Sequence, residues 1–145
     1  MNTDDPVLIQ ELRRDEGVKY EPYLDTMGIK TVGVGHNLIA HPIDFTYPLT
    51  DEQVDELLAS DLKETFAQLD KHLPWWRNMN YPRQRACTNL CFNMGINGLL
   101  TFHNTLAAMQ AGDWDAVVDG LKSSKWAQQV GSGRSNRIES LMETD

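Results

Sequence analysis

The sequence predicts an α+β protein in which a small β-hairpin lobe and a larger helical lobe are joined by a long helix. Strand-forming residues broken by glycines are confined to residues 20–36, and one uninterrupted helical pattern covers residues 51–73. Shorter helical segments fill most of the remaining chain. The expected single domain, 1–145, consists of a small lobe over about 16–50, a connecting helix over about 51–73, and a helical lobe over 1–15 and 74–145.

The first helix is expected to begin near Asp4 or Asp5 and to end at Gly17. Either aspartate can accept hydrogen bonds from the first free N–H groups, and Pro6 suits the first helical position. Glycine commonly ends a helix because it tolerates backbone conformations that other residues avoid. This leaves Glu16 in the last turn of the helix.

The clearest β signal in the chain lies between residues 20 and 36. Val32 and Val34 favour a strand, while the glycines around them mark bends or close approaches of the backbone. The segment from Asp25 to Gly28 has the composition of a turn between two strands. We therefore expect one hairpin, followed by a loop over residues 37–48 that contains two prolines.

Thr50 and Gln53 have the spacing of a capping box, which predicts that the long helix begins there. Apolar residues then recur at helical spacing as far as Leu73, and Pro74 stops the pattern. At about 1.5 Å per residue, a helix of this length exceeds about 30 Å and can join two lobes. Further helices are expected from Pro82 onward and over residues 104–111, 113–121 and 135–143.

The composition argues against several classes of function. The 145 residues carry a net charge of −8, whereas nonspecific binding to nucleic acid needs a basic surface. No run approaches the roughly 20 apolar residues that cross a bilayer, so no membrane insertion is expected. The N-terminal residues lack the basic and apolar regions of a signal peptide, so we expect synthesis in a cytoplasm without an export signal.

Cys87 and Cys91 lie four residues apart in an apolar segment. On a helix they share one face, but this geometry suits a disulfide poorly. A Cys-x3-Cys half-site for a metal lacks a second pair of ligands, because His103 alone does not complete it. We expect two buried free thiols and no metal or cofactor.

Three residues near the hairpin have the chemistry of glycoside hydrolysis. Glu16 lies at a helix end, Asp25 at the end of the first strand, and Thr31 on the second strand. Hydrolysis needs an acid that protonates the leaving oxygen and a carboxylate that activates water or stabilises positive charge. The acid should be partly desolvated. Among 21 acidic residues this spacing carries little weight by itself, and two solvated surface carboxylates remain the alternative.

The surrounding motifs strengthen this interpretation, because the chain resembles the T-even phage type lysozymes, glycoside hydrolase family 24, over about residues 12–137. The segments that carry the resemblance are Asp15-Glu16-Gly17, Tyr23-Leu24-Asp25-Thr26-x-Gly28, Thr31-Val32-Gly33-Val34-Gly35-His36, Arg85-Ala86-Cys87, Phe92-Asn93-Met94-Gly95, Phe102-His103-Asn104-Thr105-Leu106, Gly112-Asp113-Trp114-Asp115-Ala116 and Ser124-Lys125-Trp126, with Arg134 and Arg137 at the end. The resemblance implies a lysozyme-like fold and the cleavage of peptidoglycan.

Carried over position by position, the resemblance implies a role for each catalytic candidate. Glu16 would be the general acid, Asp25 the second carboxylate, and Thr31 the residue that helps to position the attacking water. The family inverts the anomeric centre, and inverting sites leave roughly 6.5–9.5 Å between the two carboxyl groups.

Four further residues match positions that contact substrate in the family: Asn37, Phe92, Thr105 and Arg134. Arg134 is expected to face the catalytic acid, although a solvated arginine is the alternative, and for Phe92 a role in the core is equally compatible. His36 and Asp61 match a structural ion pair, which we expect to contribute to stability and not to catalysis. The stretch between these two residues is shorter than in the best-known relatives, which implies a reduced small lobe.

The resemblance implies a phage-type endolysin that hydrolyses the β-1,4 bond between N-acetylmuramic acid and N-acetylglucosamine and so lyses the host. Such a protein would be a monomer in the host cytoplasm and would need a separate holin-like protein to reach the wall. A lytic transglycosylase is one alternative, disfavoured because Asp25 and Thr31 are superfluous in that reaction. A non-catalytic wall-binding module of a tail or secretion apparatus is the other.

Overall fold

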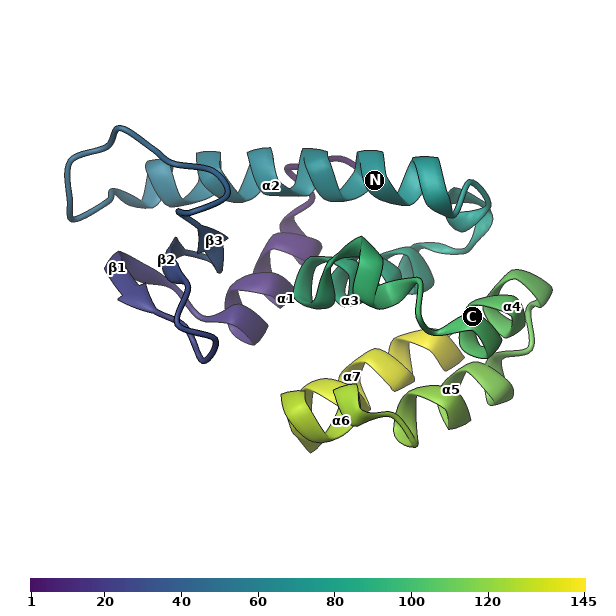
Figure 1. Ribbon diagram of the computed structural model, residues 1–145. Helices are drawn as coiled ribbons and strands as arrows, with labels where there is room; N and C mark the ends of the chain where they lie inside the picture. Colours follow the sequence, from purple (N-terminus) through teal and green to yellow (C-terminus); the bar gives the residue numbers. More distant parts are fainter. The chain divides into compact units, whose positions relative to one another are not determined.

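The computed structural model describes residues 1–145, which form two compact units, Met1–Glu64 and Thr65–Asp145. The expected α+β class is confirmed, because the chain is mostly helical and contains one small antiparallel sheet (Figure 1). The division places the first helix in the same unit as the sheet, whereas the sequence analysis grouped residues 1–15 with 74–145. The assignment of lobes therefore stays a prediction.

Helix α1 (Pro6–Glu16) has the expected ends. The Asp5 side chain accepts a hydrogen bond from the backbone N–H of Leu8 at 2.9 Å, which satisfies one of the free donors of the first turn. Leu8 and Leu12 are fully buried and anchor the helix in the first unit. Gly17 follows with a φ of 75°, so the chain turns away directly after Glu16.

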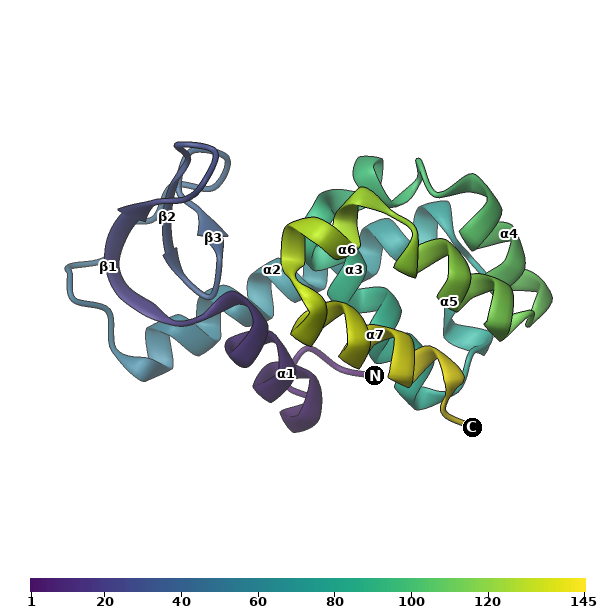
Figure 2. The ribbon, with the colours of Figure 1, turned by 90° about the horizontal axis from the view of Figure 1, so that it is seen from below.

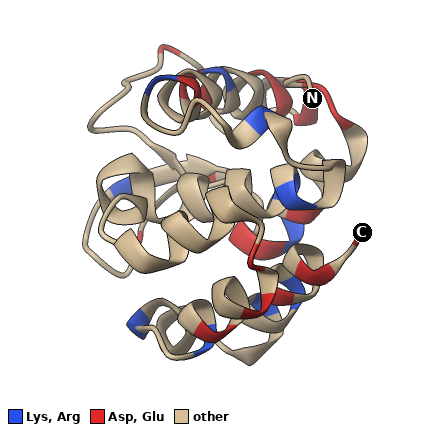
Figure 3. Cartoon of the chain, turned by 90° about the vertical axis from the view of Figure 1, so that its right-hand side faces the viewer, with Lys and Arg blue, Asp and Glu red and all other residues tan.

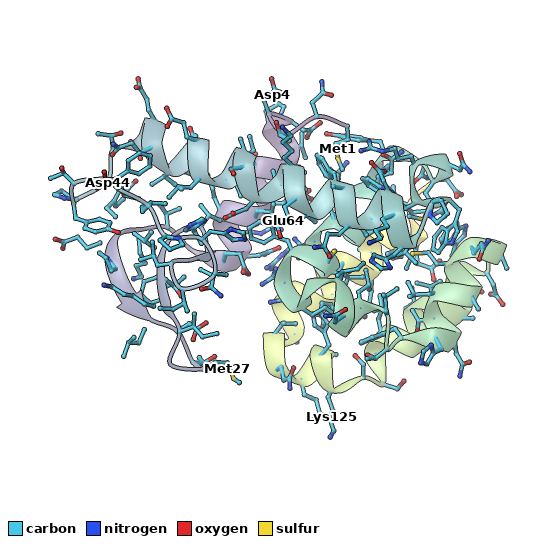
Figure 4. All side chains as sticks on the ribbon, turned by 45° about the horizontal axis from the view of Figure 1, so that its top comes forward. Met1, Asp4, Met27, Asp44, Glu64 and Lys125 are labelled. Carbon is cyan, nitrogen blue, oxygen red and sulfur yellow. The ribbon has the colours of Figure 1, made fainter.

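The first unit contains a three-stranded antiparallel sheet in the order β1 (Lys19–Leu24), β2 (Lys30–Gly33) and β3 (His36–Asn37). The predicted hairpin is confirmed, with a turn between β1 and β2 that ends at Gly28. The sequence analysis missed β3, because two residues are too few to display an alternating pattern. Figure 4 labels Met27 at the tip of the hairpin and Asp44 in the loop before the next helix.

Helix α2 (Asp51–His72) begins in the first unit and ends in the second. The predicted capping box is present: the Thr50 hydroxyl accepts a hydrogen bond from the Gln53 N–H at 3.1 Å, and the Gln53 side chain accepts one from the Thr50 N–H at 3.0 Å. Arg13 of α1 binds Asp55 on the second turn of α2 at 2.9 Å, which ties these helices together within the first unit.

The second unit is helical and contains η1 (Trp76–Asn78), α3 (Tyr81–Leu99), α4 (His103–Ala111), α5 (Trp114–Lys122), α6 (Lys125–Val130) and α7 (Ser132–Glu143). Helix α7 packs against α3, α5 and α6, as Figure 2 shows. The sequence analysis missed α6, whose six residues are too few for a periodic pattern, and placed the start of α7 at residue 135. Glycines at 131 and 133 hid its first turn.

Cys87 and Cys91 are buried free thiols on α3, as expected. Burial raises the pKa of the Cys87 thiol far above its usual range and that of Cys91 to about 12, so both stay protonated at neutral pH. Figure 3 marks the acidic and the basic residues, and both kinds occur along the helices. None of the helices combines the length and the apolar character that crossing a membrane requires.

Candidate active site

Glu16 is the last residue of α1, and its side chain is half-buried. The tight turn between β2 and β3 approaches its carboxyl group closely. A Cβ atom placed on Gly35 would lie 3.2 Å from Oε1 of Glu16, and Gly35 has a φ of 66°. Glycine is therefore the residue that allows this turn to pass the carboxyl group without a clash or a strained backbone.

Asp25 follows the last residue of β1, and the hairpin turn fixes its carboxylate. Its Oδ1 atom accepts hydrogen bonds from the backbone N–H groups of Met27 and Ile29, both at 2.8 Å. The Asp25 N–H in turn donates to the carbonyl oxygen of Ile29 at 3.0 Å. No residue of the chain binds Oδ2, so this oxygen is held in place but remains available to a ligand.

Thr31 lies on β2 and is 4% exposed. Its hydroxyl donates its hydrogen to the carbonyl oxygen of Ile29 at 2.8 Å. Because a hydroxyl has one hydrogen and two lone pairs, Oγ1 can serve a further partner only as an acceptor. The same residue, Ile29, thus helps to orient both Asp25 and Thr31.

Tyr23 lies near both carboxylates, those of Glu16 and Asp25. It lies on β1 directly opposite Thr31 on β2, so the two side chains share one face of the sheet. Its pKa is raised, chiefly by partial burial and further by the negative charges of Glu16 and Asp25. Both charges therefore act on the same phenol.

Tyr23 was named from the sequence only as part of a motif, and its place beside both carboxylates was not predicted. Its position two residues before Asp25 was the available signal, because residues i and i+2 of a strand point to the same side. The approach of Glu16 depends on how α1 meets the sheet, which no local pattern reveals.

Asn37 lies on β3 directly opposite Thr31, on the other side from Tyr23. Its side-chain oxygen accepts hydrogen bonds from the backbone N–H groups of Ile39 at 2.9 Å and Ala40 at 3.0 Å. The oxygen is used by the turn after β3, which leaves the NH₂ group of the side chain as the donor for a ligand.

Three of the candidate residues lie in the second unit. Phe92 on α3 is half-buried. Arg134 on α7 is 7% exposed, and its Nε and Nη2 atoms donate to Oδ1 of Asn89 at 3.1 and 2.8 Å. This arginine is therefore held within the unit, which excludes the alternative of a solvated surface side chain.

Thr105 on α4 is 8% exposed and lines an open pocket of about 370 Å³ in the second unit. Asn104 and Ser124 contribute polar groups to the same pocket, and Phe102 contributes an aromatic ring. Gly120 on α5 lies so close to the Thr105 hydroxyl that a side chain there would collide with it. No cluster of three or more His, Cys, Asp and Glu side chains has the arrangement of a metal site.

Comparison with known proteins finds several similar chains. The pre-baseplate central spike protein Gp5 of Enterobacteria phage T4 is 31% identical over 94% of this chain, which spans only 28% of that protein. Probable T4-type lysozyme 1 of Dictyostelium discoideum is 28% identical over 92% of this chain and 91% of its own length. The endolysin of Salmonella phage P22 is 32% identical over 60% of each chain.

The sequence also matches the family model described as phage lysozyme, over residues 13–143. This match covers the end of α1, the sheet, α2 and every helix of the second unit, and it includes every candidate site residue. The expected resemblance and the expected class of enzyme, a lysozyme-type hydrolase, are confirmed at the level of the family. The chain belongs to the phage lysozyme family.

Proposed function

We propose that this chain hydrolyses the β-1,4 bond between N-acetylmuramic acid and N-acetylglucosamine in bacterial peptidoglycan. The observation that supports this most directly is the match of residues 13–143, which include Glu16, Asp25 and Thr31, to the phage lysozyme family. Two carboxyl groups that share one neighbourhood, one at a helix end and one held in a turn, suit the acid and the second carboxylate of a glycosidase.

Glu16 acts as the general acid in this proposal. Its carboxyl group transfers a proton to the glycosidic oxygen while the bond between that oxygen and the anomeric carbon breaks. Its side chain is half-buried at the end of α1. The close passage of Gly35 limits the space in which the carboxyl group can move.

Asp25 and Thr31 act on the attacking water. The water oxygen bonds to the anomeric carbon as the glycosidic bond breaks, and one water proton passes to Asp25. Oδ2 is the oxygen of Asp25 that the turn leaves available. Since the Thr31 hydroxyl donates to Ile29, its oxygen can accept a hydrogen bond from this water and orient it. Such a water attacks from the face opposite the leaving group, so the anomeric centre is inverted.

The remaining candidates bind the sugar chain in this proposal. Asn37 offers its side-chain NH₂ group to sugar oxygens, because its own oxygen is used by the following turn. Thr105 offers a hydroxyl in the open pocket of the second unit, and Phe92 offers an aromatic ring for a sugar face. Arg134 contributes a positive charge held in position by Asn89.

The biological role proposed here is that of a phage-type endolysin that acts as a monomer on the wall after release from the host cytoplasm by a holin-like protein. The likeness to an endolysin supports it. A second candidate role is a lysozyme unit of a phage tail. The observation in its favour is the similarity of 94% of this chain to part of a central spike protein.

Clearing of permeabilised Gram-negative cells tests the activity, with Glu16→Gln beside the parent protein. We expect the substitution to lower the clearing rate by roughly 10²–10⁴-fold while circular dichroism and thermal unfolding stay unchanged. Glu21→Gln is the matched control, because Glu21 is an exposed residue of β1. A folded Glu16→Gln protein that clears cells at the parental rate would contradict the assignment.

The products separate hydrolysis from the alternatives. Mass spectrometry of digested wall should find reducing N-acetylmuramic acid ends, whereas a lytic transglycosylase leaves anhydro ends that are lighter by one water. Binding to wall without any soluble product would support a non-catalytic wall-binding module.

A further inference from the structure

The phenol of Tyr23 is half-buried, and no residue of the chain accepts a hydrogen bond from its hydroxyl group. A polar group that is fully buried usually finds a partner in the protein or in ordered water, whereas a half-buried hydroxyl can keep its hydrogen for a ligand. Tyr20, three residues earlier on the same strand, has one: its hydroxyl donates to Oδ1 of Asp51 at 2.6 Å. The Tyr23 hydroxyl is therefore a hydrogen-bond donor that the folded chain leaves available to a ligand.

The sheet places this donor among the candidate catalytic groups. Tyr23, Thr31 and Asn37 lie opposite one another on β1, β2 and β3, so their side chains form one polar row on a single face. Asp25 lies two residues after Tyr23, directly beyond the end of the same strand. The pairing of β1 with β2 is irregular between Lys19 and Tyr23, and irregularities of this kind often redirect a side chain beside an active site.

The two carboxylates locate the row relative to the substrate. Hydrolysis requires the scissile bond to lie between the general acid and the second carboxylate. The charges of Glu16 and Asp25 both reach the Tyr23 phenol, yet neither carboxylate is hydrogen-bonded to it. The Tyr23 phenol is thus close enough to feel both carboxylates and is hydrogen-bonded to neither.

We propose that Tyr23 is a positioning residue that donates a hydrogen bond to an oxygen of the sugar at the scissile bond, and so holds that sugar between Glu16 and Asp25. This inference rests on the proposed function. A sugar hydroxyl or acetamido oxygen is a suitable acceptor. The attacking water is not, because a hydrogen bond donated to the water would draw electron density away from its nucleophilic oxygen.

A neutral donor suits this position better than a cationic one. Lysine or arginine between two carboxylates would pair with them and hold both ionised, whereas the general acid has to carry a proton. The raised pKa of Tyr23 keeps its phenol protonated throughout the pH range in which such an enzyme acts, so the hydroxyl remains a donor.

The first experiment measures sugar binding without catalysis. The probe is a purified peptidoglycan tetrasaccharide of alternating N-acetylglucosamine and N-acetylmuramic acid, and its Kd is measured by calorimetry on Glu16→Gln protein. Adding Tyr23→Phe should weaken binding by about 3- to 10-fold, as expected for the loss of one neutral hydrogen bond. Adding Tyr20→Phe instead should leave Kd unchanged. An unchanged Kd in the Tyr23→Phe protein would overturn the proposal.

Kinetics and titration give readouts that a purely structural role would not produce. In the otherwise unmodified protein, Tyr23→Phe should lower kcat/KM by about tenfold or more. Both limbs of the pH profile should stay in place, because the hydroxyl binds the sugar and does not bind either carboxylate. A shifted limb would instead assign Tyr23 to a carboxyl group and overturn the proposal. Ultraviolet titration should show that one tyrosine ionises at lower pH in Glu16→Gln and in Asp25→Asn than in the parent protein. If its pKa does not shift in these variants, the place of Tyr23 between the two carboxylates is contradicted.

The failure of this inference can be distinguished from failure of the proposed function. Wall clearing by a folded Glu16→Gln protein would remove the proposed function, whatever Tyr23 does. Unchanged binding after Tyr23→Phe, in a chain whose clearing depends on Glu16, would remove only the role of Tyr23.

Discussion

His36 and Asp61 form an ion pair that fastens the end of the small sheet to α2, with Nδ1 of His36 2.8 Å from Oδ2 of Asp61. The other ring nitrogen, Nε2, lies 2.8 Å from the carbonyl oxygen of His41. Both nitrogens therefore face acceptors, and only the doubly protonated imidazolium satisfies both. The hydrogen bond to Asp61 is the main cause of the raised pKa of His36, and burial opposes it in part. The ion pair expected from the sequence is confirmed.

This pair predicts a pH-dependent contribution to stability. Because the folded pKa of His36 is raised above its unfolded value of about 6.5, the stabilisation is complete below about pH 6.5 and is lost as pH rises through the folded pKa. We expect His36→Asn to lower the free energy of unfolding by about 2 kcal/mol at pH 6, with a narrowing gap at higher pH. Urea unfolding of both proteins across pH 5.5–9 measures it.

His72→Asn is the control for this experiment, since His72 is exposed in the last turn of α2. It should change the unfolding free energy by only a few tenths of a kcal/mol. A gap between the parent and His36→Asn that stays constant over the whole pH range would contradict the ionic role of His36.

Gly35→Ala should impair activity far more than it impairs stability. Gly35 has a φ of 66°, and an added Cβ would press on Oε1 of Glu16 at 3.2 Å. Gly28 is the matched control, because it has a φ of 77° but no atom within 4 Å of an added Cβ. Each alanine should cost about 1–2 kcal/mol from backbone strain. Only Gly35→Ala should also reduce the clearing rate of folded protein, by roughly tenfold or more. Equal activity of the two variants would show that the contact with Glu16 is unimportant.

The parts of the fold that local chemistry determines could be predicted from the sequence. Asp5, Pro6 and Gly17 set the ends of α1, and Thr50 with Gln53 sets the start of α2, because each acts on its own turn of helix. Strand β3 and helix α6 could not, since two and six residues do not display a period.

The candidate site was predictable as a set of residue types but not as an arrangement. The positions of Asp25 and Thr31 follow from the hairpin, whose turn was visible in the sequence. Two features depend on how the end of α1 meets the sheet: the position of the Tyr23 hydroxyl near both carboxylates, and the close approach of Gly35 to Glu16. Contacts between segments distant in sequence leave no trace in local composition, so these two residues required the structure.

Glu139 on α7 is a second feature that the sequence did not reveal, because a glutamate in a C-terminal helix is expected to be solvated. It is 4% exposed, and neither of its carboxyl oxygens has a hydrogen-bond partner. Burial raises its pKa, and the positive charge of Lys122 lowers it by a smaller amount. The folded protein therefore binds this proton more tightly than the unfolded chain does.

The pH dependence expected from Glu139 has the same direction as that from His36, because the pKa of each group is raised in the folded protein. Above the unfolded pKa of about 4.3, stability falls as pH rises through the raised folded pKa, and the full penalty applies above it. Replacing Glu139 with leucine should therefore increase the unfolding free energy at pH 8 by about 1–3 kcal/mol, and by less at pH 4.5. Thermal and urea unfolding at both pH values measure the change. Destabilisation of Glu139→Leu at pH 8 would show that the carboxylate is favourably solvated or paired.

Asp25 offers a substitution that separates its structural role from its chemical one. In Asp25→Asn the side-chain oxygen can still accept the N–H groups of Met27 and Ile29, which now bind Oδ1 at 2.8 Å, so the turn should be retained. The amide cannot take a proton from water, so the clearing rate should fall by roughly 10²–10⁴-fold. Asp25→Ala removes the acceptor as well and should lower the unfolding free energy by about 1–2 kcal/mol more than Asp25→Asn does. If Asp25→Asn retains the parental rate on purified peptidoglycan, Asp25 serves only to shape the turn, and the water must be activated by another group.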